Sequence, residues 1–173
     1  GFLIEDDKEI ADRFNAKIID RSIHPLKQDN ITSIQNAFFQ YMIGNVDFSI
    51  AKLHNAKLFY IEKKIIPVPY DFDMNGFVDP SYETVSERPA NSFLINEITQ
   101  RKFRGLKRDV KLFEQVRQEF LNNKKTFIAI IESFENQFEI KSEYNNAKDY
   151  LLDFFKILEN DKSFKSEILD EMR

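Results

Sequence analysis

Apolar side chains recur every three or four residues through the second half of the chain, and this spacing constrains the fold more than any other feature. From about Glu97 to the end the pattern is typical of amphipathic helices, because residues three and four apart share one helical face. The three apolar stripes are Val110, Phe113, Val116 and Phe120; Phe127, Ile130, Phe134 and Phe138; and Tyr144, Ala147, Leu151, Phe154 and Leu158. We therefore expect a helical second half, with the intervening charges on solvated faces.

Two helices are expected in the first half of the chain. Residues 8–20 carry apolar side chains at helical spacing until a His-Pro pair breaks the pattern. A second helix is predicted over residues 31–43, with Asn30 as its N-cap, since apolar residues recur there at steps of three and four. Gly44 marks its end, and a polar loop, GNVDFSIAKLHN, follows.

A β-hairpin is predicted over residues 56–70, AKLFYIEKKIIPVPY. Two short runs of aliphatic and aromatic residues flank the charged EKK, as in two strands joined by a turn. Because proline cannot donate to a sheet, Pro67 and Pro69 confine their strand to an edge or an end. The expected fold class is therefore α+β and mainly α, and a length of 173 residues suits a single domain spanning residues 1–173.

Charge and composition exclude several functions. With 25 Lys and Arg among 29 Asp and Glu, the net charge is −4 and no basic run is present, so nucleic acid is not an expected partner. The absence of cysteine excludes disulfides, thiolate metal sites and cysteine nucleophiles. No apolar run approaches the ~20 residues of a membrane span, and the N-terminus lacks the features of a signal peptide.

The stretch from Pro67 to Glu83 nearly matches a calcium-binding EF-hand loop. Oxygen ligands stand at loop positions 1, 3, 5 and 9, which are Asp71, Asp73, Asn75 and Asp79, and the glycine of position 6 is Gly76. However, position 12 is Tyr82, and the expected glutamate comes one place late, at Glu83. Two prolines also precede the loop, where an EF-hand needs a helix. The pattern thus disfavours an EF-hand and leaves open a looser cation site.

The same residues have a second interpretation, at the open end of the predicted hairpin. Asn55 immediately precedes the first strand and Asp71 follows the second, so antiparallel pairing would bring them roughly 5 Å apart. Two such oxygen ligands suit Mg²⁺, which completes its shell with water and phosphate oxygens. Asp47, eight residues before Asn55, could then accept the proton of a hydroxyl that attacks a γ-phosphate. The order of these residues indicates phosphoryl transfer.

These motifs also resemble a known family. GNVDFSIAKLHN followed by IPVPYDFD is similar to the catalytic core of atypical bacterial kinases of the spore-coat CotH type and, more distantly, of the HipA type. The resemblance implies a kinase C-lobe-like domain in which Asp47 is the catalytic Asp, while Asn55 and Asp71 bind the nucleotide ATP through Mg²⁺ (or Mn²⁺). Asp73 would be a further metal ligand and Asn75 an auxiliary residue. The expected acceptor is a hydroxyl, with a Ser or Thr of a protein substrate as the first candidate.

The resemblance covers about residues 1–80 and has clear departures. The spacing from Asp47 to Asn55 is longer than in protein kinases, no HRD triplet occurs, and DFD stands in place of DFG. A kinase also needs a strand Lys and usually a Gly-rich cover over the phosphates, whereas the four glycines here are not clustered. GFLIEDDKEIADR resembles the junction between the small and large lobes of CotH-like proteins. A small N-terminal lobe is therefore expected upstream of Gly1, and the isolated chain is expected to have little or no activity.

Simpler roles remain open for neighbouring residues. His54 could orient a carboxylate or be structural, and Asn45 could brace the loop or cap the preceding helix. Arg101 and Arg104 could hold a phosphate or an acidic substrate, or could form surface ion pairs.

Other functional classes also remain open. Asp47 and Asn55 are residue types that cap turns, so the chain could be a pseudokinase lobe or a cation-binding helical interaction module. Paired carboxylates at Asp71 and Asp73 could serve a metal-dependent hydrolase. That class is disfavoured because the two side chains would point to opposite faces if the strand continued.

Overall fold

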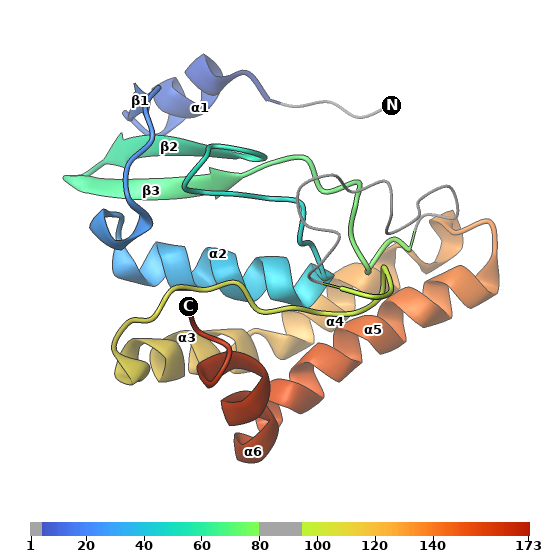
Figure 1. Ribbon diagram of the computed structural model, residues 1–173. Helices are drawn as coiled ribbons and strands as arrows, with labels where there is room; N and C mark the ends of the chain where they lie inside the picture. The colour runs from blue at the N-terminus through green and yellow to red at the C-terminus, as the bar shows by residue number, and fades with distance from the viewer. Residues whose placement is uncertain (1–4, 80–94) are drawn as a thin grey trace.

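The computed structural model describes residues 5–79 and 95–173, which form helices and one three-stranded antiparallel sheet. The elements are α1 (Asp7–Arg13), β1 (Lys17–Ile19), α2 (Asn30–Ile43), β2 (Ala56–Ile61), β3 (Lys64–Pro69), α3 (Val110–Asn122), α4 (Lys124–Ser133), α5 (Lys141–Glu159) and α6 (Asp161–Phe164), with short 3-10 turns at Pro25–Lys27 and Glu135–Gln137 and a π-helical turn at Lys165–Leu169. Figure 1 shows a layered arrangement: α1 lies above the sheet, α2 runs beneath it, and the C-terminal helices lie below α2. The predicted α+β, mainly α class is confirmed.

The predicted helix over residues 8–20 is wrong in its second half. The helix α1 is capped by Asp6 and ends at Arg13. Asn15 then takes a φ of 46°, which lies outside the helical region, and residues 17–19 pair with β2 as the strand β1. The apolar spacing that suggested a longer helix therefore comes from a short helix followed by an edge strand.

The helix predicted over residues 31–43 is confirmed as α2, but its N-cap is Asp29 rather than Asn30. Oδ1 of Asp29 accepts a hydrogen bond from a backbone N–H in the first turn (3.0 Å), and Asn30 is already helical. Gly44 ends the helix in the left-handed conformation, with a φ of 68°. A Cβ at this position would overlap Oη of Tyr150, so the end of α2 requires glycine.

The predicted hairpin is confirmed as β2 and β3, which pair along their full lengths. Glu62 and Lys63 form the two-residue turn, and both have a positive φ (48° and 66°), as hairpin turns of this length require. The strand order is β1-β2-β3, so β3 is an edge strand. This position explains how Pro67 and Pro69 are tolerated, because an edge strand needs no donor on its outer side.

The C-terminal helices begin at Val110 rather than near Glu97. Residues 95–109 form no helix and instead run alongside α2, as the yellow-green segment of Figure 1 shows. Arg101 and Arg104 in this segment donate hydrogen bonds to backbone carbonyls of α2 and of the loop that follows it. Among residues 5–79 and 95–173, no helix is long and apolar enough to cross a membrane.

Phenylalanine rings fill the core between α2 and the C-terminal helices. The ring of Phe38 contacts those of Phe103, Phe113, Phe120 and Phe164, with centroids 5.5 to 6.3 Å apart. All five side chains are buried. Aromatic pairs at this separation stabilise a core beyond the area that they bury. This packing fixes α2, and α2 in turn places the loop that leads to the hairpin.

Candidate functional site

The loop between α2 and β2 holds the carboxylate of Asp47 in one orientation. Its Oδ1 lies 3.1 Å from Nε2 of His54, and its Oδ2 accepts a hydrogen bond from Nδ2 of Asn55 (3.2 Å). Nδ2 of Asn55 also donates to the backbone carbonyl of Asp47 (2.8 Å), and the backbone N–H of Asp47 donates to Oδ1 of Asn45 (2.7 Å). His54 therefore orients the carboxylate, and Asn45 braces the loop. The Asp47 side chain is 17% exposed, so a small group can still reach it.

Asn55 and Asp71 lie at the open end of the hairpin, one at each strand terminus. The backbone N–H of Tyr70 donates to the carbonyl of Asn55 (3.2 Å), which extends the pairing one step past the strands. Asn55 and Asp71 both adopt a left-handed conformation, with φ of 51° and 60°. Asn and Asp tolerate this conformation better than other non-glycine residues, so it lets the backbone turn at both strand ends. Because Nδ2 of Asn55 donates to Asp47, its Oδ1 is the atom that can bind a cation.

Two other carboxylates, those of Asp73 and Asp47, lie near Asp71. Burial raises its pKa, and the neighbouring carboxylates of Asp73 and Asp47 raise it further. Oδ1 of Asp71 is buried and has no hydrogen-bond partner among the described residues. The strand does not continue to Asp71 and Asp73, since it ends at Pro69 and the backbone turns at Asp71, so the alternation that would place their side chains on opposite faces does not apply. The two carboxylates instead interact, and their repulsion favours a cation or a proton between them.

The residues at this end of the hairpin fit a hard divalent cation. The carboxylates of Asp71 and Asp73 and the amide oxygen of Asn55 are the oxygen ligands that Mg²⁺ and Mn²⁺ prefer. A cation would also supply the missing partner of the buried Asp71 oxygen. In the part of the chain that the structure describes, no group of three or more His, Asp or Glu side chains could hold a metal ion. A cation here would thus depend on the amide oxygen and on water or phosphate oxygens.

The EF-hand interpretation fails on the structure around Asn75. A strand, β3, enters the loop where an EF-hand needs a helix. Asn75 is only 2% exposed, and its Oδ1 accepts hydrogen bonds from the backbone N–H groups of Phe77 (2.9 Å) and Val78 (3.1 Å). This side chain therefore stabilises the loop from within. Tyr82 and Glu83, which break the EF-hand pattern in the sequence, lie outside the described residues.

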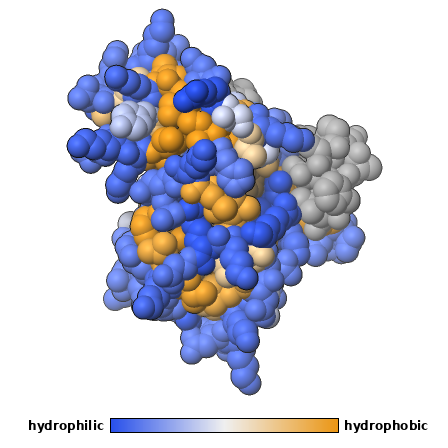
Figure 2. Space-filling view, turned by 60° about the vertical axis from the view of Figure 1, so that its left-hand side comes forward, coloured by the Kyte–Doolittle hydropathy of each residue, from blue (hydrophilic) through white to orange (hydrophobic). Residues whose placement is uncertain are grey.

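A cleft of about 860 Å³ opens beside Asp71, between α1 and the sheet. Its apolar walls come from α1 and from one face of the hairpin, and charged side chains of both signs also line it; the lining includes Ile10, Phe14, Phe59, Val68, Arg13, Lys57, Asp71 and Asp73. Figure 2 shows a hydrophobic patch at the height of α1 and the sheet and further patches below it, with hydrophilic side chains around them. A cleft of this size and character suits a small molecule with an apolar part and a charged part.

The two arginines singled out in the sequence hold backbone carbonyls rather than surface carboxylates. Arg101 donates to two carbonyls in the last turn of α2 (3.1 and 3.2 Å). Arg104 donates to the carbonyls of Val46 (2.5 Å) and Phe48 (2.8 Å), which flank Asp47. Burial lowers the pKa of Arg104 to about 10, so the group stays charged at neutral pH. Arg104 thus fixes the loop that carries Asp47, a role that depends on a contact between distant segments and that no sequence motif indicates.

No protein-family model, curated protein or solved structure matches this chain. The candidate site is therefore assigned from geometry and chemistry alone; it consists of Asp47, His54, Asn55, Asp71 and Asp73.

Proposed function

We propose that this chain is the large lobe of a CotH-like atypical kinase that transfers the γ-phosphate of ATP to a hydroxyl, with a Ser or Thr of a protein as the acceptor. One observation carries the proposal. Asp47 is hydrogen-bonded to Asn55, and Asp71, with an unpartnered carboxylate oxygen, lies close enough for Asp47 to raise its pKa. Asp47, Asn55 and Asp71 thus lie together at one end of the hairpin, beside a cleft, and this grouping supports a proton acceptor next to two oxygen ligands.

The residues of the chain would position the reactants and move one proton. The oxygen of the acceptor hydroxyl attacks the γ-phosphorus, the bond from this phosphorus to the bridging oxygen breaks, and ADP leaves. Asp47 accepts the hydroxyl proton, while His54 and Asn55 keep its carboxylate in place. Mg²⁺ or Mn²⁺ held by Asn55, Asp71 and Asp73 would offset the negative charge of the phosphates. The nucleotide would occupy the cleft of about 860 Å³.

The proposal requires parts that this sequence does not contain. Kinases use a strand Lys and a cover over the phosphates, and the four glycines of this chain are not clustered into such a cover. We propose that a small lobe joined upstream of Gly1 supplies both. The cleft lies between α1 and the open face of the sheet, so a lobe above this face would close it.

The test is phosphate transfer from radiolabelled ATP by the full-length protein in the presence of Mg²⁺. Asp47→Asn and Asp71→Asn should each lower the rate by at least ~100-fold, since general-base catalysis alone contributes about 10²- to 10⁴-fold. Chelation of the metal should abolish transfer. The matched control is Asp12→Asn, which removes an exposed carboxylate from α1 outside the cleft lining and should leave the rate unchanged.

Equal rates in the wild type, Asp47→Asn and Asp71→Asn would overturn the proposal. Binding of ATP without any transfer would contradict the activity and support a pseudokinase lobe instead.

A further inference from the structure

A second pocket, of about 180 Å³, adjoins the loop that carries Asp47. Its walls come from the residues directly after Asp47, from α2 and from the segment before α3. Arg104, Arg108 and Arg173 line it, and none of the lining residues that the structure describes is acidic. The whole chain carries a net charge of −4, so this pocket concentrates positive charge against the general trend.

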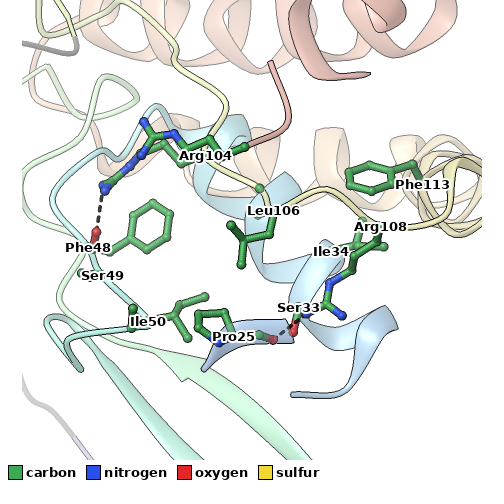
Figure 3. A pocket seen from close by; sticks show the side chains of 14 residues that line it. Pro25, Ser33, Ile34, Phe48, Ser49, Ile50, Arg104, Leu106, Arg108 and Phe113 are labelled. Carbon is green, nitrogen blue, oxygen red and sulfur yellow. Dashed lines mark hydrogen bonds between the residues drawn. The ribbon is translucent and has the colours of Figure 1, made fainter. Parts of the chain in front are cut away.

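The middle of this pocket is apolar. Figure 3 shows Phe48, Ile50 and Leu106 between Arg104 on one side and Arg108 on the other. Arg104 is held by the carbonyl of Phe48 (2.8 Å), and Arg108 donates to a backbone carbonyl beside α2 (2.6 Å). The guanidinium groups are therefore fixed at the two sides of an apolar floor.

The positive charge of the pocket is not fully compensated. Nε of Arg104 is buried and has no hydrogen-bond partner among the described residues. The pKa of Arg104 is lowered first by burial and then by the nearby charge of Arg173, and Asp47 only partly opposes this. The pKa of Arg108 is also lowered by burial, against the influence of Asp29. An anion in the pocket would relieve the repulsion between the guanidinium groups and accept charge-assisted hydrogen bonds from them.

We propose that this pocket binds an acidic side chain of the acceptor peptide, next to an apolar residue, while the acceptor hydroxyl lies at Asp47. This inference rests on the proposed function and assigns its substrate class. Phe48 follows Asp47 directly, and an extended peptide advances about 3.3–3.6 Å per residue, so a side chain one to three residues from the hydroxyl reaches the pocket. The apolar floor takes the aliphatic part, and Arg108 and Arg173 face the carboxylate. The small volume admits a single side chain.

The test compares two dye-labelled peptides by fluorescence polarisation with the full-length protein. Both contain Ser followed by Leu, and the next residue is Glu in one peptide and Gln in the other. The Glu peptide should bind at least ~10-fold more tightly, since hydrogen bonds to charged groups are about twice as strong as neutral ones. Arg108→Glu should abolish this preference. Lys107→Glu makes the same charge change one residue away, on an exposed side chain outside the pocket, and should retain it.

A second variant guards against misfolding, because Arg108 also holds the carbonyl of Pro25. Arg173→Gln changes an exposed side chain and should weaken the Glu preference without lowering the melting temperature. Equal affinity for the two peptides, or equal losses in Arg108→Glu and Lys107→Glu, would overturn the inference.

The two proposals fail in different ways. A Glu preference that Arg108→Glu abolishes, found without any phosphate transfer, keeps the acidic-peptide pocket and rejects the kinase. Transfer with equal kcat/KM for the two peptides keeps the kinase and rejects the pocket.

Discussion

Replacing Arg104 with methionine should destabilise the protein by about 2 kcal/mol, and the value follows from opposing effects. The substitution removes two hydrogen bonds from a charged donor, each worth about 1.5–3 kcal/mol, to the carbonyls of Val46 and Phe48. It also removes the stacking of the guanidinium over the Phe48 ring at 4.8 Å, worth about 1 kcal/mol. Against this, burial and the nearby charge of Arg173 lower the pKa of Arg104 to about 10, which indicates a cost of about 3 kcal/mol for the charged group that methionine recovers.

The measurement is urea unfolding followed by far-UV circular dichroism. The expected loss corresponds to a decrease in Tm of about 4–8 °C for a chain of this size. Lys107→Met is the matched control, because its side chain is exposed, and it should change stability by less than about 0.5 kcal/mol. An Arg104→Met protein as stable as the wild type, or more stable, would show that burial outweighs the bonds and that Arg104 does not hold the Asp47 loop.

Two further predictions concern the backbone and the site. Gly44→Ala should lower the free energy of unfolding by about 2–4 kcal/mol, since the left-handed backbone costs about 1–2 kcal/mol and the new Cβ would overlap Tyr150. The control is Asn15→Ala, at an exposed residue that is also left-handed, which should lower it by only about 1 kcal/mol. Equal losses in the two variants by urea unfolding would contradict the steric argument. Asp71→Asn should raise Tm at pH 7 by about 2–4 °C. The folded-state pKa of Asp71 is raised above 3.8, so the stability of the wild type falls as pH rises through the raised pKa. The variant has no carboxylate at this position and does not lose this stability. Mg²⁺ should raise the Tm of the wild type and not of Asp71→Asn, and a lower Tm in the variant at pH 7 would refute the repulsion between Asp71 and Asp73.

Local sequence signals predicted those parts of the fold that local interactions determine. The hairpin followed from two apolar runs around a charged turn, and the second helix from its apolar spacing up to Gly44. The first helix was too long in the prediction because nothing local marks the left-handed Asn15 or the pairing of residues 17–19 with β2. The segment 95–109 is not helical, because its arginines donate hydrogen bonds to backbone carbonyls of α2 and of the loop after it. Such contacts between distant segments leave no trace in the spacing of apolar residues.

The order of the site residues along the chain could be predicted from the sequence, whereas the contacts between their side chains could not. Antiparallel pairing placed Asn55 and Asp71 at one end of the hairpin, as the spacing indicated. The sequence could not decide whether His54 orients Asp47, because that contact depends on the path of the loop. Nor could it show that Asp73 faces Asp71, since the strand ends and the backbone turns left-handed between them. These details depend on individual φ values, which residue type determines only weakly outside glycine and proline.

The most direct test of the central claim is the position of a bound Mn²⁺ ion. In nuclear magnetic resonance spectra of this chain with ATP, substoichiometric Mn²⁺ should broaden the backbone amide signals of Asn55 and Asp71 first and leave those of α6 sharp. In Asp71→Asn the selective broadening should disappear. Broadening centred on other acidic residues, or unchanged in Asp71→Asn, would contradict a cation site formed by Asn55 and Asp71 at the open end of the hairpin.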